Sequence, residues 1–225
     1  MIPVLNKKVN CGAVKMAKKN SISQETIKRM ITYLRYLEAQ KKKGVRIISS
    51  KDVTSFLNVP PEQFRKDLSF FGGFGKRGVG YDVNNLLETI KKILGLDKTI
   101  RAVLAGAGRL GAALIQYPGF SGINIDIIAA FDNDSAKIGK TLKNTKIRDI
   151  KKIGDYTRKN RVRVALLCVP ADAAQSVADV LVRSGVKGIL NFAPVRLILT
   201  ADVYAGNVDM ASELGNVVYH MKVPD

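Results

Sequence analysis

Hydrophobic positions in the first part of the chain recur every three or four residues, which predicts an amphipathic helix. The apolar positions of this helix are Ile27, Met30, Ile31, Leu34 and Leu37. Ser21 or Ser23 can cap its start, and Gly44 follows three lysines at its end. The first segment is therefore predicted to be a helix with one buried face.

Two shorter helices joined by a tight turn are predicted next. Ser50 can cap a helix that runs through Leu57, Asn58-Val59-Pro60 forms a turn, and Pro61 suits the first turn of the following helix. The apolar stripe of that second helix consists of Phe64, Leu68 and Phe71. Helix, turn and helix in this order are typical of a DNA-binding motif. The outward positions predicted to reach base edges and phosphates are Gln63, Arg65, Lys66 and Ser69.

Residues 72–81 are too rich in glycine for a helix interior and carry Lys76 and Arg77 side by side. We interpret them as a basic wing that lays two cations on a phosphate ridge or in a minor groove. The alternative, solvated charges beside a flexible loop, is less compatible with the preceding helix-turn-helix. Residues 84–95 predict a further helix that Gly95 ends.

From residue 98 onward, apolar strands alternate with helices, which is typical of a doubly wound parallel sheet. Strands are predicted at 100–105, 125–131, 162–169, 187–192 and 202–208, and helices at 150–159 and 171–184. A change of pattern near residue 97 indicates two domains.

The first strand of this second half runs into a Gly-x-Gly-x-x-Gly motif that opens a helix, the context in which the motif binds a dinucleotide. The first glycine permits a tight turn, the second lets a pyrophosphate approach the backbone, and the third allows close helix packing. The residues predicted to line this loop are Gly106, Ala107, Gly108, Arg109, Leu110 and Gly111. This predicts an α/β Rossmann domain.

Asp132 ends the next strand, at the distance where a carboxylate binds the ribose hydroxyls of a dinucleotide. A carboxylate there repels a 2′-phosphate, so NAD(H) is favoured over NADP(H). Four residues at strand ends can line the nicotinamide, although plain loop roles are equally compatible with them. These residues are Val169, Pro170, Phe192 and Pro194.

Charge strengthens the case for a polyanionic partner. The chain has 37 Lys+Arg against 19 Asp+Glu, a formal net charge of +18. Residues 1–98 hold net +12 and residues 99–225 net +6, so the helical half is the more basic one. Cys11 and Cys168 lie far apart, and Cys168 stands in an apolar run, which favours free thiols. Neither a signal peptide nor an apolar run of about 18 residues is present, so we expect a cytoplasmic protein with no membrane partner.

Candidates for catalysis are scarce. His220 is the only histidine, and no tyrosine is followed four residues later by a lysine. We predict no catalytic residue and no metal ligand, and the dinucleotide then acts as a signal. The alternatives are an NAD-dependent oxidoreductase with a basic accessory domain and a CoA-binding Rossmann module such as ligases use.

The chain resembles the Rex family of redox-sensing transcriptional repressors. The resemblance is carried by residues 31–37, 64–72, 75–81, 106–111, 130–134, 169–171 and 185–194. It implies a homodimer that binds a palindromic operator in double-stranded DNA, with NADH and NAD+ as effectors and release of the DNA when NADH binds.

The sequence patterns predict how the chain is divided, and the resemblance adds the swapped helix and the coupling residues. The expected parts are a flexible N-terminal arm (1–20), a winged-helix DNA-binding domain (21–97), a Rossmann NAD(H)-binding domain (98–206) and a C-terminal domain-swapped helix (207–225). The residues implied in coupling the two sites are Arg35, Tyr117 and Asp209, and Tyr117 is also expected to bind the dinucleotide. Each of the three also has a plain interpretation as a surface or helix-capping residue.

Overall fold

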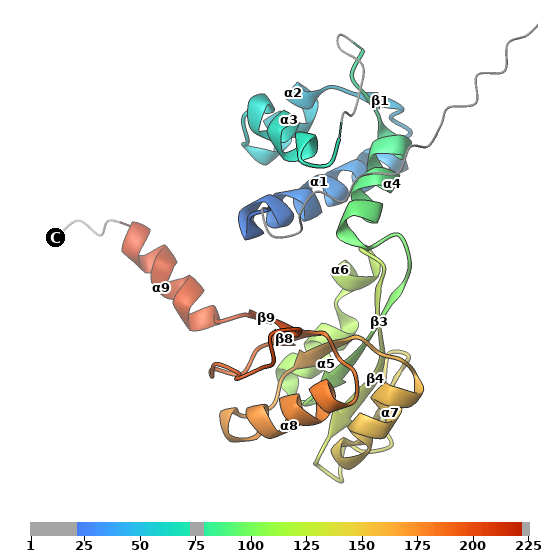
Figure 1. Ribbon diagram of the computed structural model, residues 1–225, viewed down its shortest axis with the longest axis vertical. Coiled ribbons are helices and arrows are strands. Elements are labelled where there is room, and N and C mark those ends of the chain that lie inside the picture. Colours follow the sequence, from blue (N-terminus) through green and yellow to red (C-terminus); the bar gives the residue numbers. More distant parts are fainter. Residues whose placement is uncertain (1–21, 73–78, 222–225) are drawn as a thin grey trace, which may run out of the picture. The chain divides into compact units, whose positions relative to one another are not determined.

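The computed structural model describes residues 22–72 and 79–221 (Figure 1). These residues divide into two compact units between Asp97 and Lys98. The expected N-terminal arm, Cys11 and the cations Lys76 and Arg77 lie outside the described residues.

The described part of the first unit consists of helices and one small antiparallel sheet. Its elements are α1 (Gln24–Lys42), β1 (Ile47–Ile48), α2 (Ser50–Leu57), α3 (Pro61–Ser69), β2 (Tyr81–Asp82) and α4 (Val83–Leu94). Ile47 pairs with Asp82 and Ile48 with Tyr81, so the chain after α3 returns alongside β1. This is the element order of a winged helix, as predicted.

Helix caps in the first unit agree with the sequence except at α2. The Ser23 hydroxyl accepts the Thr26 N–H at 3.1 Å and caps α1. Ser49, not Ser50, caps α2: its hydroxyl accepts the Asp52 N–H at 3.2 Å, while the Asp52 carboxylate accepts the Ser49 N–H at 2.8 Å. The prediction of Ser50 was wrong by one residue because the reciprocal bond with Asp52 selects its neighbour.

Two residues suited to the backbone of the turn separate the helices of the helix-turn-helix. Asn58 ends α2 in the left-handed conformation at φ 50°, which asparagine tolerates better than most residues. Pro61 occupies the first position of α3, where its missing N–H leaves no hydrogen bond unmade. Phe64 and Leu68 are buried, as the apolar stripe predicts, but Phe71 is only half-buried because α3 ends at Ser69.

A buried carboxylate joins α3 to α1. Asp67 is fully buried, and its oxygens accept Nε and Nη2 of Arg29 at 2.7 and 2.8 Å. Asp67 also accepts the Tyr33 hydroxyl at 2.9 Å and the Gln63 amide at 2.7 Å. Because a buried charge is tolerated only when it is paired and hydrogen-bonded, this cluster fixes how α3 lies against α1.

The pKa of Asp67 reflects a competition between burial and hydrogen bonding. Desolvation raises it, but the hydrogen bonds from Arg29, Gln63 and Tyr33 outweigh desolvation and lower the pKa of Asp67 below its ordinary value. The carboxylate is therefore the charged partner of Arg29 at neutral pH.

The second unit is a seven-stranded sheet with helices. Its elements are β3 (Ile100–Ala105), α5 (Arg109–Gln116), α6 (Pro118–Ser121), β4 (Ile125–Asp132), β5 (Thr141–Leu142), β6 (Thr145–Asp149), the 3-10 turn Ile150–Lys152, α7 (Ile153–Lys159), β7 (Val164–Leu167), α8 (Ala171–Arg183), β8 (Gly188–Asn191), β9 (Tyr204–Asn207) and α9 (Met210–His220). The strand order is β5-β6-β4-β3-β7-β8-β9, and every pairing is parallel except β5 with β6. The predicted Rossmann class is confirmed.

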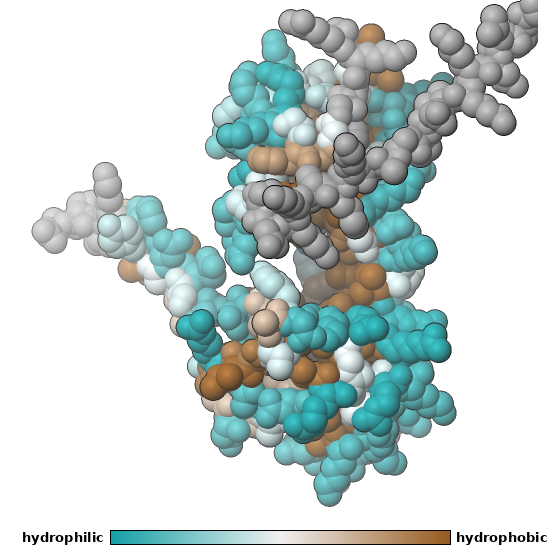
Figure 2. Space-filling view, in the orientation of Figure 1, coloured by the Kyte–Doolittle hydropathy of each residue, from teal (hydrophilic) through white to brown (hydrophobic). Residues whose placement is uncertain are grey.

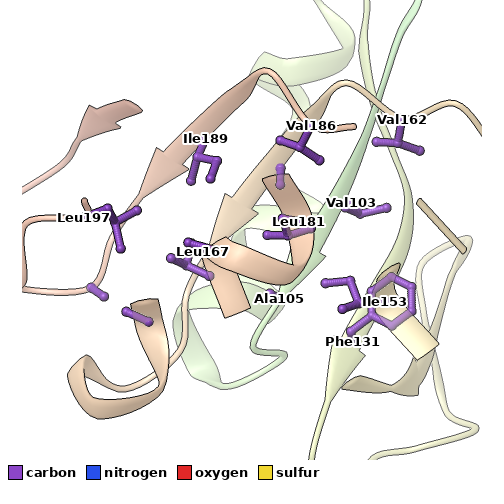
Figure 3. Packing of buried hydrophobic residues seen from close by; sticks show 14 of the residues in the cluster. Val103, Ala105, Phe131, Ile153, Val162, Leu167, Leu181, Val186, Ile189 and Leu197 are labelled. Atoms are coloured by element: carbon purple, nitrogen blue, oxygen red, sulfur yellow. The ribbon is translucent and has the colours of Figure 1, made fainter. Parts of the chain in front are cut away.

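Strand β3 divides two hydrophobic cores because alternate side chains point to opposite faces of the sheet. Val103 and Ala105 pack in a cluster with Ile153 of α7 and Leu181 of α8 (Figure 3). Leu104 packs in a second cluster with residues such as Ile115 of α5. Helices on both faces explain why the strands are almost continuously apolar.

Helix α9 differs from the other helices of this unit because every one of its residues is exposed. Its exposed apolar residues are Met210, Leu214, Val217, Val218 and Tyr219. Hydrophobic atoms of this helix are visible at the surface in Figure 2. Within residues 22–72 and 79–221, no helix is long and apolar enough to cross a membrane.

Replacing Asp67 with Ala is expected to destabilise the contact of α1 with α3 by about 3–5 kcal/mol, since it leaves Arg29 without its buried partner. Glu62→Ala on the same helix removes an exposed carboxylate and should cost about 0–1 kcal/mol. Native-state amide hydrogen exchange in α1 and α3 measures both changes. Equal exchange rates in the two variants would contradict the role of Asp67.

The contribution of Asp67 to stability also depends on pH. Because the folded-state pKa of Asp67 lies below the unfolded value near 4, this contribution is complete above about pH 4 and disappears as pH falls through the folded-state pKa.

Candidate nucleotide-binding site and DNA-binding helix

The loops after β3, β4, β7 and β8 leave the sheet at its carboxyl edge. Strand order reverses at β3, which has β4 on one side and β7 on the other. Ligands of doubly wound sheets bind at such a switch point. Asp132 ends β4, and the other residues predicted to bind the dinucleotide follow β3, β7 or β8, with the exception of Tyr117, which follows α5.

Two motif glycines are required by the packing of the chain itself. Gly106 has φ +92°, and a Cβ there would lie 2.3 Å from the Cys168 carbonyl oxygen. A Cβ on Gly111 would lie 2.0 Å from the Gly106 carbonyl oxygen. Both distances are far inside van der Waals contact, so any larger residue forces the backbone to move.

Gly108 is different. Its φ of −73° is open to every residue, and a Cβ there would meet no atom within 4 Å. Gly108 also stands at the start of α5, whose first turn has no side-chain cap. Uncapped N–H groups beside free space at a helix start are suited to a phosphate. Arg109 and Leu110, in the same first turn, are exposed.

Asp132 holds the glycine loop from the neighbouring strand. Its Oδ2 accepts the Ala107 N–H at 2.8 Å, and its Oδ1 accepts the Asp134 N–H at 2.9 Å. The side chain is buried. A carboxylate can accept about four hydrogen bonds, so with these and one from Lys137 it keeps room for a ribose hydroxyl.

Lys137 is a residue that sequence reasoning missed. Its Nζ lies 3.2 Å from Oδ2 of Asp132 and 3.5 Å from Oδ2 of Asp134. The hydrogen bond to Asp132 raises the pKa of Lys137. Lys137 is the fifth residue after Asp132, and only the turn after β4 brings the two together, so spacing alone carried no signal.

The four strand-end residues predicted for the nicotinamide lie after β7 and β8. Val169 and Phe192 are half-buried against the two cores, whereas Pro170 and Pro194 are exposed. Cys168 is half-buried, and desolvation raises the pKa of its thiol to about 12. A thiol with that pKa is protonated at neutral pH.

The residues implied in coupling have local roles within the chain. Tyr117 ends α5, is exposed, and packs edge-on against Phe120 with ring centroids 5.2 Å apart. Asp209 caps α9 by accepting the N–H groups of Ala211 and Ser212. Arg35 lies exposed on α1.

On α3, three of the four residues predicted to face DNA are exposed: Arg65, Lys66 and Ser69. The Arg65 guanidinium donates from Nη1 to the Ser50 hydroxyl oxygen at 3.0 Å and from Nη2 to Oε1 of Glu62 at 2.9 Å. Gln63 is half-buried and donates its amide to Asp67, so this amide points into the domain and not outward as predicted. Its contact with DNA stays a prediction.

Comparison with known proteins identifies the family. Residues 97–195 match the family described as CoA binding domain, and residues 21–69 match the family described as "Putative DNA-binding protein N-terminus". A redox-sensing transcriptional repressor Rex from Desulforamulus reducens is 39% identical over 204 residues, which cover 91% of this chain and 97% of that protein. The chain belongs to the Rex family.

Two solved structures of RSP, a Rex-family repressor, agree with membership of this family. RSP in complex with beta-NAD+ and operator DNA matches with a TM-score of 0.83 and 37% identity, covering 90% of this chain and 94% of that one. RSP in complex with beta-NADH matches with a TM-score of 0.78 and 36% identity, covering 90% and 95% of the two chains. The Rex match spans both units, whereas the CoA-binding match, residues 97–195, covers only part of the second unit.

The glycines predict an ordered set of stabilities. Gly111→Ala should lower the free energy of unfolding by about 1–3 kcal/mol because its Cβ overlaps a carbonyl oxygen. Gly108→Ala should cost less than about 1 kcal/mol, the effect of changing a helix N-cap in open space. Urea unfolding followed by circular dichroism measures both. Comparable losses in the two variants would show that the loop is packed differently.

Proposed function

We propose that this protein is a transcriptional repressor that binds operator DNA as a homodimer and releases it when NADH binds. The observation that carries the proposal is Gly108: nothing in the described chain requires a glycine there, and it adjoins an uncapped helix start. Family membership supplies the ligand class, because the related RSP structures contain NAD+, NADH and operator DNA.

Exposed cations of the first unit supply the DNA contacts. Arg65 is already oriented by Ser50 and Glu62, so less side-chain freedom is lost when it binds. Lys66 and Ser69 extend the same face of α3, and Lys76 with Arg77 adds two charges from the wing. The Gln63 amide can contact DNA only after it breaks its hydrogen bond to Asp67. Because phosphate contacts dominate this set, affinity for DNA falls steeply with salt.

The second unit holds the dinucleotide at the carboxyl edge. Residues 106–111 bind the pyrophosphate, Asp132 accepts a ribose hydroxyl, and Val169, Pro170, Phe192 and Pro194 border the nicotinamide. The charges of Asp132, Asp134 and Lys137 sum to −1, which disfavours a 2′-phosphate and favours NAD(H).

Closure of the site discriminates between the two redox forms. An apolar enclosure disfavours the cationic ring of NAD+, which loses its hydration, relative to the neutral ring of NADH. A difference of about 2.8 kcal/mol gives about a hundredfold preference. When NADH binds another dimer arrangement better than it binds the operator-binding one, linkage requires NADH to weaken DNA affinity by the factor of that preference.

Dimerisation gives α9 a partner. Its exposed apolar side chains are suited to a second copy, as the family resemblance implies for a swapped helix. Asp209, at the start of α9, exchanges hydrogen bonds between Tyr117 and Arg35 across the dimer and so couples the nucleotide site to the winged helix.

The protein acts in the cytoplasm and turns over no substrate. The alternative, an NAD-dependent oxidoreductase, needs a group that donates or accepts a proton beside the nicotinamide. His220 instead contacts the Asn216 carbonyl oxygen on α9, at 2.8 Å. The Cys168 thiol is protonated. A CoA-binding module leaves the winged helix without a role.

A fluorescence-anisotropy titration of labelled operator tests this function. NADH should weaken binding of the wild-type protein by about a hundredfold, and NAD+ should weaken it far less. Gly108→Ala should bind operator normally without dinucleotide but respond to NADH only at much higher concentrations. Equal operator affinity with NADH, with NAD+ and with neither would refute the proposal, and NADH consumption with a panel of carbonyl compounds would favour the enzyme.

A further inference from the structure

A buried asparagine stands at the end of β8. Asn191 is 1% exposed, and its side chain is fully engaged in hydrogen bonds. Its Nδ2 donates to the carbonyl oxygens of Ala193 and Val195 at 3.2 and 2.8 Å, and its Oδ1 accepts the Ala193 N–H at 3.0 Å. Burying an amide costs free energy unless it is satisfied in this way.

The bonds to Ala193 and Val195 fix the loop that follows β8. This loop contains Phe192 and Pro194, the two residues of β8's carboxyl end that we assign to the nicotinamide side of the site. The Phe192 N–H also donates to the Leu167 carbonyl oxygen of β7 at 2.9 Å. The loop is therefore anchored on one side by β7 and from within by Asn191.

Asn191 also holds the strand that leads into α9. Its Nδ2 lies 3.0 Å from Oδ1 of Asn207, its partner in the register of β8 with β9. The Val208 N–H donates to the Asn191 carbonyl oxygen at 2.8 Å. Val208 is followed directly by Asp209, the N-cap of α9.

We propose that Asn191 is a positioning residue that transmits the state of the nicotinamide loop to the start of α9 through its hydrogen bond with Asn207. This inference rests on the proposed function and deepens it. A shift of the loop on ligand binding displaces the Asn191 side chain, because three of its four bonds lie on that loop. The fourth bond then moves or breaks at Asn207, two residues before Asp209.

The hydrogen bond between Asn191 and Asn207 is best tested at Asn207, because Asn191 Nδ2 has fewer hydrogens than acceptors. Nδ2 has two hydrogens but faces three acceptors, so removing the Asn207 acceptor leaves both hydrogens with partners in the loop. Asn207 is itself exposed. Removing the Asn207 side chain therefore breaks the side-chain link, while the Val208 main-chain bond remains and the buried amide stays satisfied.

The experiment compares Asn207→Ala, which removes the acceptor, with Asn207→Asp, which keeps an acceptor oxygen. Asn144→Ala, an exposed asparagine in the turn between β5 and β6, is the matched control. For each full-length variant, calorimetry gives the NADH dissociation constant of the free protein, and anisotropy gives operator affinity with and without saturating NADH. Thermal unfolding checks the fold.

We expect Asn207→Ala to retain the NADH dissociation constant and the dinucleotide-free operator affinity within about twofold, while the factor by which NADH weakens operator binding falls at least about fivefold. Asn207→Asp and Asn144→Ala should keep the wild-type factor. An unchanged factor in Asn207→Ala, or a factor lost equally in Asn207→Asp, overturns the inference and leaves the proposed function standing. A wild-type protein with no NADH effect refutes both.

Discussion

The turn between β3 and α5 is the constraint on which the second unit depends. Gly106 and Gly111 let the strand end, the helix and the backbone at Cys168 approach more closely than any side chain allows. The uncapped start of α5 then lies at the edge of the sheet where the strand order reverses. Because the chain leaves the space at Gly108 open, the same turn that packs the fold also leaves uncapped N–H groups of the kind that suit an anion.

A buried carboxylate fixes the functional segment in each unit. Asp67 joins α3 to α1 through Arg29 and Tyr33, and so sets the direction of the predicted DNA-binding face. Asp132 joins the end of β4 to the glycine loop through the Ala107 N–H. Such groups are costly to bury, and their hydrogen bonds are satisfied only in one arrangement, which makes each segment rigid before any ligand binds.

Patterns that are local in the sequence predicted the fold well. Apolar runs alternating with helices, the glycine motif and the two turn residues Asn58 and Pro61 each depend on neighbouring residues alone. Contacts between distant residues could not be predicted this way: Asp67 stands 38 residues from Arg29, and Asn191 meets Asn207 only through the register of two strands. Strands β5 and β6 were missed because they are short and carry polar residues.

The central claim is that the dinucleotide site and the DNA-binding face share one equilibrium, and reciprocity tests it most directly. Calorimetric titration of NADH into the free protein and into its complex with operator gives two dissociation constants at the same salt concentration. The account predicts that operator weakens NADH binding by the same factor by which NADH weakens operator binding. Identical NADH affinity in the free and the DNA-bound protein would contradict it.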